Sequence, residues 1–138
     1  MAKTVIIDTG PLVAVLSQRD HSHAWARSHF ELLRFPCLTC EAVLSESVFL
    51  LEGSKRAQEA LAKMLERGVI KTEFSFDVSR TEILHLLRRY RDTPLSFADA
   101  CLVRMSELHA DSTVFTTDAD FNVYRRNGRQ SIPLMAPF

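Results

Sequence analysis

The sequence predicts an α/β fold with a mostly parallel sheet, and three observations lead to it. Short apolar runs of strand length alternate with longer segments whose apolar residues recur at helical spacing. Ser, Thr, Asp, Gly and Pro mark the boundaries between these segments. The 138 residues, of which 46% are hydrophobic and 25% charged, have an ordinary globular composition. We therefore expect residues 1–138 to form a single domain.

The first elements follow from one apolar run and two helix starts. Residues 3–8 predict a short buried strand, because Val, Ile and Ile are consecutive there. Gly10-Pro11 then opens a helix, since proline is tolerated at the first helical position. Residues 21–34 predict a second helix, capped by Asp20.

A brief strand and two helices follow. Residues 36–39 predict the strand, and Thr39 is expected to cap a helix that runs to Glu52. Gly53 ends that helix, and Ser54 starts another that ends near Gly68.

The last third alternates strands and helices again. Residues 69–76 predict a strand, residues 77–91 a helix capped by its first aspartate, and residues 96–109 a further helix. Residues 113–116 predict a strand. Residues 132–135 predict an edge strand, because they contain a proline.

Composition limits where the protein works. No apolar run approaches the roughly 20 residues that a membrane helix needs, and the apolar stretch near residue 5 is shorter than a signal peptide requires. We therefore expect a cytoplasmic protein. Three cysteines, an odd number, argue against a disulfide framework. Cys37-Leu-Thr-Cys40 matches the spacing of redox and zinc motifs. It lacks a second ligand pair, and Cys37 precedes the expected helix start, so Cys37, Cys40 and Cys101 are interpreted as small apolar side chains.

The net charge of zero conceals local clusters of arginine. Arginines make up 13 of the 17 basic residues, and arginine suits bidentate phosphate contacts. Two interpretations stay open for each cluster, a solvated face or a phosphate-binding surface. The clusters are Arg88, Arg89 and Arg91, and then Arg125, Arg126 and Arg129.

Glu46 stands where a helix core face is expected. Its helical neighbours are Ala42, Val43, Phe49 and Leu50, which form an apolar stripe. A lone carboxylate there is costly unless it is paired or bound to a metal. The alternatives are a salt bridge to a core arginine or a side chain that turns to the helix edge.

Asp99 repeats this pattern beside Leu95, Leu102 and Val103. A second explanation competes, because Ser96 and Asp99 have the spacing of a capping box. The carboxylate could serve both ends.

Two further acids follow predicted strands. Asp8 ends the first strand and Asp118 follows a later one, although either could merely cap the next turn or helix. Asp120 competes with Asp118 for the same role. Ligands bind at the carboxyl ends of parallel strands, so these acids are expected at one edge of the sheet with Glu46 and Asp99.

Carboxylates gathered there repel one another unless cations neutralise them, and oxygen ligands alone select Mg²⁺ or Mn²⁺. Such ions suit phosphodiester hydrolysis.

Four segments resemble the PIN-domain family, and in particular its VapC-type toxins of toxin–antitoxin pairs. They carry the four acids in the family's order and span about residues 3 to 121. The segments are Val-Ile-Ile-Asp8-Thr-Gly-Pro, Ser45-Glu46 in its apolar helix, Leu95-Ser-Phe-Ala-Asp99-Ala, and Val114-Phe-Thr-Thr-Asp118-Ala-Asp120-Phe.

The resemblance implies a three-layer α/β/α sandwich with about five strands, and an endoribonuclease that depends on Mg²⁺ or Mn²⁺. The implied partners are an RNA substrate, a cognate antitoxin and a second copy in a homodimer. Thr117 and Asp120 would support the site, and RNA binding by Arg125, Arg126 and Arg129 rests on charge alone. The alternative is a catalytically silent PIN fold that binds RNA or docks a protein. The implied catalytic and metal-binding acids are Asp8, Glu46, Asp99 and Asp118.

Overall fold

Five parallel strands form the central sheet of the computed structural model, which describes residues 3–138. The strand order is β3-β2-β1-β4-β7, and every neighbouring pair is parallel. This confirms the predicted α/β class with its parallel sheet. The strands are β1 (Thr4–Ile7), β2 (Cys37–Leu38), β3 (Ile70–Lys71), β4 (Ser112–Phe115) and β7 (Leu134–Met135).

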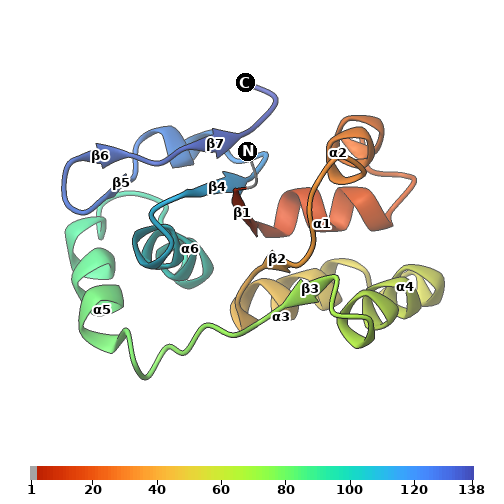
Figure 1. Cartoon of the computed structure of the whole chain (residues 1–138), viewed down its shortest axis with the longest axis horizontal. Helices are drawn as coiled ribbons and strands as arrows, with labels where there is room; N and C mark the ends of the chain where they lie inside the picture. Colours follow the sequence, from red (N-terminus) through yellow and green to blue (C-terminus); the bar gives the residue numbers. More distant parts are fainter. Residues whose placement is uncertain (1–2) are drawn as a thin grey trace.

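Helices cover both sides of the sheet, which makes the fold an α/β sandwich. In Figure 1, α1, α2 and α4 lie on one side of the sheet and α5 and α6 on the other. The helix α3 contacts both α1 and α6. The helices are α1 (Thr9–Leu16), α2 (His23–Phe30), α3 (Glu41–Leu50), α4 (Lys55–Glu66), α5 (Arg80–Arg89) and α6 (Phe97–Leu108), and a 3₁₀ turn, η1, spans Ala119–Asn122.

The core lies between the middle strands and α6. Ile6, Ile7 and Phe115 are fully buried in β1 and β4, and Leu102 on α6 is buried with them. Burial of each such side chain stabilises the folded state by about 1.5–3 kcal/mol. Most of α6 is buried, because the helix packs between the sheet and α5.

The strand order places a crevice at the centre of the sheet. The chain begins in β1, moves outward through β2 to β3, and then returns to form β4 on the other side of β1. The order therefore reverses between β1 and β4, which is where ligands bind in open parallel sheets. The segments that leave these two strands begin at Asp8 and Thr116.

Several boundaries differ from the sequence prediction, each for a local reason. The strand predicted at 69–76 pairs only at Ile70–Lys71, because β2, its one neighbour, is itself two residues long. Thr39 does not cap α3, since its hydroxyl donates to the carbonyl of Ile7 at 2.8 Å and Cys40 takes the cap position.

Two other predicted caps lie outside their helices. Ser79, not Asp77, precedes α5. Asp20 accepts a hydrogen bond from the backbone N–H of Ser22 at 2.8 Å, and Ser22 is the residue that precedes α2. Asp20 therefore stabilises the turn before α2, whereas Asp77 forms an exposed ion pair with Arg80, the first residue of α5.

An antiparallel hairpin near the C-terminus has no counterpart in the sequence prediction. It pairs β5 (Arg125–Arg126) with β6 (Gln130–Ser131). Residues 127–129 form its turn, in which Asn127 and Gly128 have positive φ angles of 51° and 80°, a conformation that these two residue types adopt readily.

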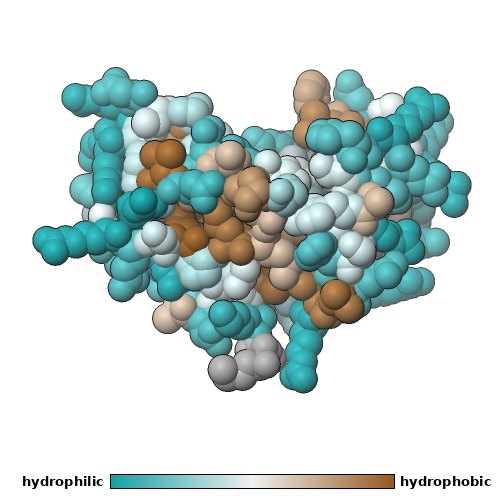
Figure 2. All heavy atoms as spheres, turned by 90° about the horizontal axis from the view of Figure 1, so that it is seen from above, coloured by the Kyte–Doolittle hydropathy of each residue, from teal (hydrophilic) through white to brown (hydrophobic). Residues whose placement is uncertain are grey.

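The surface is mostly hydrophilic on the face seen from above. Figure 2 shows hydrophilic side chains over most of this face, with hydrophobic ones gathered in smaller patches between them. Within residues 3–138, no helix is both long and apolar enough to cross a membrane.

Gly10 and Thr117 form a close contact between α1 and the segment after β4, and this contact gives a stability prediction. A Cβ on Gly10 would overlap the Thr117 Oγ1 atom. We expect Gly10→Ala to destabilise the protein by about 1–3 kcal/mol, since overpacking in a tight contact has that cost.

With Thr117→Ala also present, the overlap disappears. The alanine at position 10 should then be neutral or slightly stabilising, because alanine favours a helix over glycine. Chemical unfolding of the two single variants and the double variant measures the coupling. Strictly additive effects would contradict the proposed contact.

Candidate active site

Asp8 is the most buried of the predicted acids, with 6% of its surface exposed. It caps α1: its Oδ1 accepts the Thr9 backbone N–H at 2.7 Å, and its Oδ2 accepts the Thr116 hydroxyl at 2.7 Å. The pKa of Asp8 is raised to about 7, mainly by burial and in smaller part by the negative charges of Asp99 and Asp118, while the two hydrogen bonds oppose the shift. Asp8 is therefore a carboxylate that lies close to two others and is poorly solvated.

Asp99 lies at the first turn of α6 and is also buried. The capping box predicted from sequence is present, with Asp99 N–H donating to Ser96 Oγ at 3.0 Å and Ser96 N–H donating to Asp99 Oδ2 at 3.2 Å. The Tyr124 hydroxyl also donates to Oδ2, at 3.3 Å. Burial is the main cause that raises the pKa of Asp99, and the charge of Asp118 adds to it.

Asp118 follows β4 and caps η1 by accepting the backbone N–H of Asp120 at 2.9 Å. Its own N–H donates to Thr116 Oγ1 at 3.0 Å, so this one hydroxyl connects the segments of Asp8 and Asp118. Asp118 raises the pKa of both Asp8 and Asp99, whereas Asp120 acts, with Asp99 and Asp118, on the pKa of Tyr124. This difference favours Asp118 over Asp120 as the fourth acid.

Glu46 reaches the same region, but the prediction of its surroundings was wrong. Its side chain does not sit in a core stripe: Glu46 is exposed, and Phe49 and Leu50 beside it are 67% and 58% exposed. The buried face of α3 is formed by Val43 and Ser47. The apolar residues misled the prediction because the last turn of α3 presents several of them to solvent. Glu46 nevertheless lies near Asp8, since its Oε1 accepts the Thr9 hydroxyl at 2.6 Å.

Three residues of the site were missed by the sequence analysis. Thr116 looked like the last residue of a buried strand, and Thr9 was given no role beside Asp8 in the first motif. Tyr124 carried no signal because it lies beyond the recognisable motifs. The predicted supporting hydroxyl was that of Thr117, which lies against Gly10 in the structure, whereas Thr116 is the threonine that contacts Asp8.

The arginines predicted to contact RNA lie on or beside the C-terminal hairpin. Arg126 donates to the carbonyls of Ser106 and Ala110 at 3.0 and 3.3 Å, and so caps the far end of α6 from Asp99. Arg125 donates to backbone carbonyls of the preceding residues. Arg129 is exposed on the hairpin. Two of the three guanidinium groups thus already have partners within the chain.

All three cysteines are buried. The thiol of Cys40 lies near that of Cys101 on α6, since each shifts the pKa of the other, whereas Cys37 is not among the groups that shift the pKa of Cys40. Burial raises the pKa of Cys37 to about 12, which makes a reactive thiolate unfavourable there. The Cys37–Cys40 spacing therefore marks no pair in space.

The donor set fits a hard divalent cation by its chemistry. In the described chain, no ion pair involves Asp8, Glu46, Asp99 or Asp118, so their charges have no internal counterion. Their donors are carboxylate oxygens, which Mg²⁺ and Mn²⁺ prefer. No three His, Cys, Asp or Glu side chains of residues 3–138 are yet arranged closely enough to hold an ion, so binding requires the carboxylates to turn toward it.

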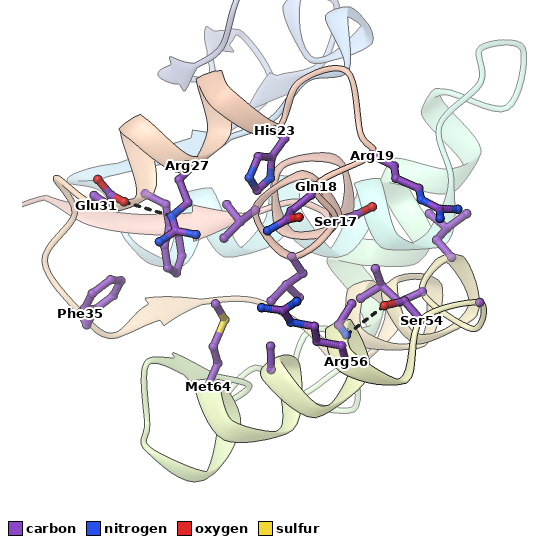
Figure 3. A pocket seen from close by; sticks show the side chains of 18 residues that line it. Ser17, Gln18, Arg19, His23, Arg27, Glu31, Phe35, Ser54, Arg56 and Met64 are labelled. Atoms are coloured by element: carbon purple, nitrogen blue, oxygen red, sulfur yellow. Dashed lines mark hydrogen bonds and ion pairs between the residues drawn. The ribbon is translucent and has the colours of Figure 1, made fainter.

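The acidic site is separate from a cavity that lies among the helices on one side of the sheet. This cavity of about 900 Å³ lies between α1, α2 and α4, and Figure 3 shows its lining side chains. Arg19, Arg27 and Arg56 border it, and none of the four acids does. The four acids therefore belong to the carboxyl edge of the sheet and do not line this cavity.

Comparison with known proteins agrees with the fold. A PIN domain family model matches residues 5–127. The structure also resembles that of VapC20 from Mycobacterium tuberculosis, described as a sarcin–ricin loop cleaving toxin, with a TM-score of 0.72 and 21% sequence identity. The match covers 87% of this chain and 94% of that one. No curated protein sequence matches the chain.

The raised pKa of Asp8 gives a prediction for stability in the absence of metal. A carboxyl whose pKa rises from 3.8 to about 7 on folding binds a proton more tightly in the folded state. Its contribution to stability is therefore complete below about pH 4 and is lost as the pH rises through about 7. Asp8→Asn removes this loss, so near pH 8 it should raise the free energy of unfolding by on the order of 2 kcal/mol.

Urea unfolding with a chelator, at about pH 4 and about pH 8, tests this expectation. The gain should shrink toward zero at the lower pH, where wild-type Asp8 is itself neutral. A gain of equal size at both pH values would show that the carboxylate charge is not its cause.

Proposed function

Because the chain belongs to the PIN domain family, we propose that it is a metal-dependent endoribonuclease that acts as the toxin of a toxin–antitoxin pair. One observation carries the proposal: Asp8 and Asp99 are buried at the carboxyl edge of the sheet, where Asp118 raises the pKa of both, and no ion pair within residues 3–138 neutralises these acids. The description of VapC20 as an RNA-cleaving toxin supports the choice of RNA.

In this proposal, Asp8, Glu46, Asp99 and Asp118 hold Mg²⁺ or Mn²⁺. Such an ion supplies a water nucleophile at neutral pH and neutralises charge on the phosphate under attack. Thr116 holds Asp8 and the backbone before η1 in register through its two hydrogen bonds. Thr9 orients Glu46 with its hydroxyl and Asp8 with its N–H. These hydrogen bonds keep the acids near one another before the substrate binds, and the carboxylates turn toward the ion when it enters.

The burial of Asp8 and Asp99 has a second role. A poorly solvated carboxylate gains more from a cation than an exposed one does, because the surrounding dielectric is lower. A raised pKa also makes proton release part of metal binding. Metal affinity should therefore increase with pH across the range in which Asp8 ionises.

Cleavage of a structured RNA is the first test. Purified protein with Mn²⁺ should cut the RNA internally, and an excess of chelator should stop it. Asp8→Asn and Asp99→Asn should lower the rate by at least about 10²-fold while the far-UV circular dichroism spectrum stays unchanged, since they remove an acid of the metal site. Asp20→Asn, an acid outside the site, serves as the control. Cleavage that persists in chelator would refute metal dependence, and a folded protein without any cleavage would favour the silent RNA-binding or docking alternative.

The toxin assignment needs a separate test in cells. Induced expression of the wild-type chain should arrest bacterial growth, and the Asp8→Asn chain at equal expression should not. Size-exclusion chromatography of the purified protein, with light scattering, separately tests the proposed homodimer. If the cells grow normally although the nuclease is active, the proposed cleavage reaction stands. The toxin role is then refuted, together with the antitoxin partner that it requires.

A further inference from the structure

We propose that Tyr124 is a positioning residue for Asp99, whose hydroxyl holds one carboxylate oxygen so that the other can bind the cation. The inference rests on the proposed metal-dependent function and adds a residue outside the four acids. It starts from the hydrogen bond that the Tyr124 hydroxyl makes to Asp99.

Two donors to the Asp99 carboxylate end on the same atom. The Tyr124 hydroxyl and the Ser96 N–H donate to Oδ2, at 3.3 and 3.2 Å. Ser96 is part of the helix cap and fixes where Oδ2 lies relative to α6. The tyrosine adds a second direction, and two donors from different segments limit rotation of the carboxylate about its Cβ–Cγ bond. Oδ1 is then the oxygen that can bind a cation.

The Tyr124 ring is held in a fixed position. It is fully buried, and it packs edge-on against Tyr90 and Phe121 with ring centroids 5.3 and 5.2 Å away. Its backbone N–H donates to the carbonyl of Asp120 at 3.4 Å, directly after the turn that Asp118 caps. The hydroxyl therefore has little freedom to leave Asp99, and it couples α6 to the segment that carries Asp118.

A neutral phenol is suited to this role. It stays protonated because burial and the neighbouring acids make its ionisation unfavourable, so it can only donate toward a carboxylate. A lysine or arginine here would neutralise Asp99 and compete with the cation. Removal of a group that orients a metal-binding carboxylate in this way typically weakens metal affinity about 10–100-fold.

Tyr90 provides a matched control within the same aromatic cluster. It is buried, and its hydroxyl also makes one hydrogen bond, as acceptor of the Arg125 N–H at 2.9 Å. That bond reaches no acid. Tyr90→Phe and Tyr124→Phe therefore remove the same atom from neighbouring rings, and only the second removes a donor to Asp99.

The test is Mn²⁺ binding by isothermal titration calorimetry to the wild-type, Tyr124→Phe and Tyr90→Phe proteins. We expect Tyr124→Phe to weaken Mn²⁺ binding about 10-fold and Tyr90→Phe to change it by less than about 2-fold. Cleavage of RNA by Tyr124→Phe should need correspondingly more Mn²⁺ and should approach the wild-type rate when Mn²⁺ saturates. A residue with a purely structural role would not be rescued by metal.

The outcomes separate the two proposals. If the wild type binds Mn²⁺ and Tyr124→Phe binds it equally well, the positioning role is refuted and the nuclease proposal stands. Equal weakening by both variants would assign the effect to packing and also refute the role. If the wild type binds no Mn²⁺, the proposed function and this inference fail together.

Discussion

The burial of two carboxylates, Asp8 and Asp99, beside a third at the carboxyl edge of the sheet is the constraint on which the site depends. Asp8 and Asp99 lose solvation on folding, and each is further disfavoured as an anion by the charge of Asp118. The fold tolerates this because Thr9, Thr116, Ser96 and Tyr124 donate hydrogen bonds to the carboxylates. These bonds reduce the cost without supplying a counter-charge. The remaining imbalance is what a divalent cation can relieve.

The topology explains how residues distant in sequence reach this edge. The reversal of strand order between β1 and β4 brings Asp8 and Asp118 to neighbouring strand ends. The helix α6 packs against both strands and begins at the same edge, so its capping residue Asp99 joins them. Asp99 thus has two tasks at once, because the carboxylate that closes the helix cap also belongs to the acidic cluster. At the opposite end of α6, Arg126 binds carbonyl groups of the chain.

The sequence predicted the parts of this arrangement that follow from local chemistry. Apolar runs located the strands, and an acid after a buried strand located Asp8 and Asp118, because parallel strands share one carboxyl edge. The capping box was recognisable from Ser96 and Asp99 alone. Glu46 was selected for a reason that does not hold, since exposed apolar residues on the last turn of α3 imitate a core stripe. Tyr124 and the role of Thr116 could not be predicted, because long-range packing brings each of them to its partner across about 25 and 108 positions of the chain.

A crystal structure of the protein soaked with Mn²⁺, with anomalous diffraction recorded near the manganese edge, tests the central claim most directly. Our account requires an anomalous peak bounded by oxygens of Asp8, Asp99 and Asp118, with Asp99 Oδ1 facing it. Manganese found only at other surface carboxylates, with these three side chains unmoved and still without a cation, would contradict it.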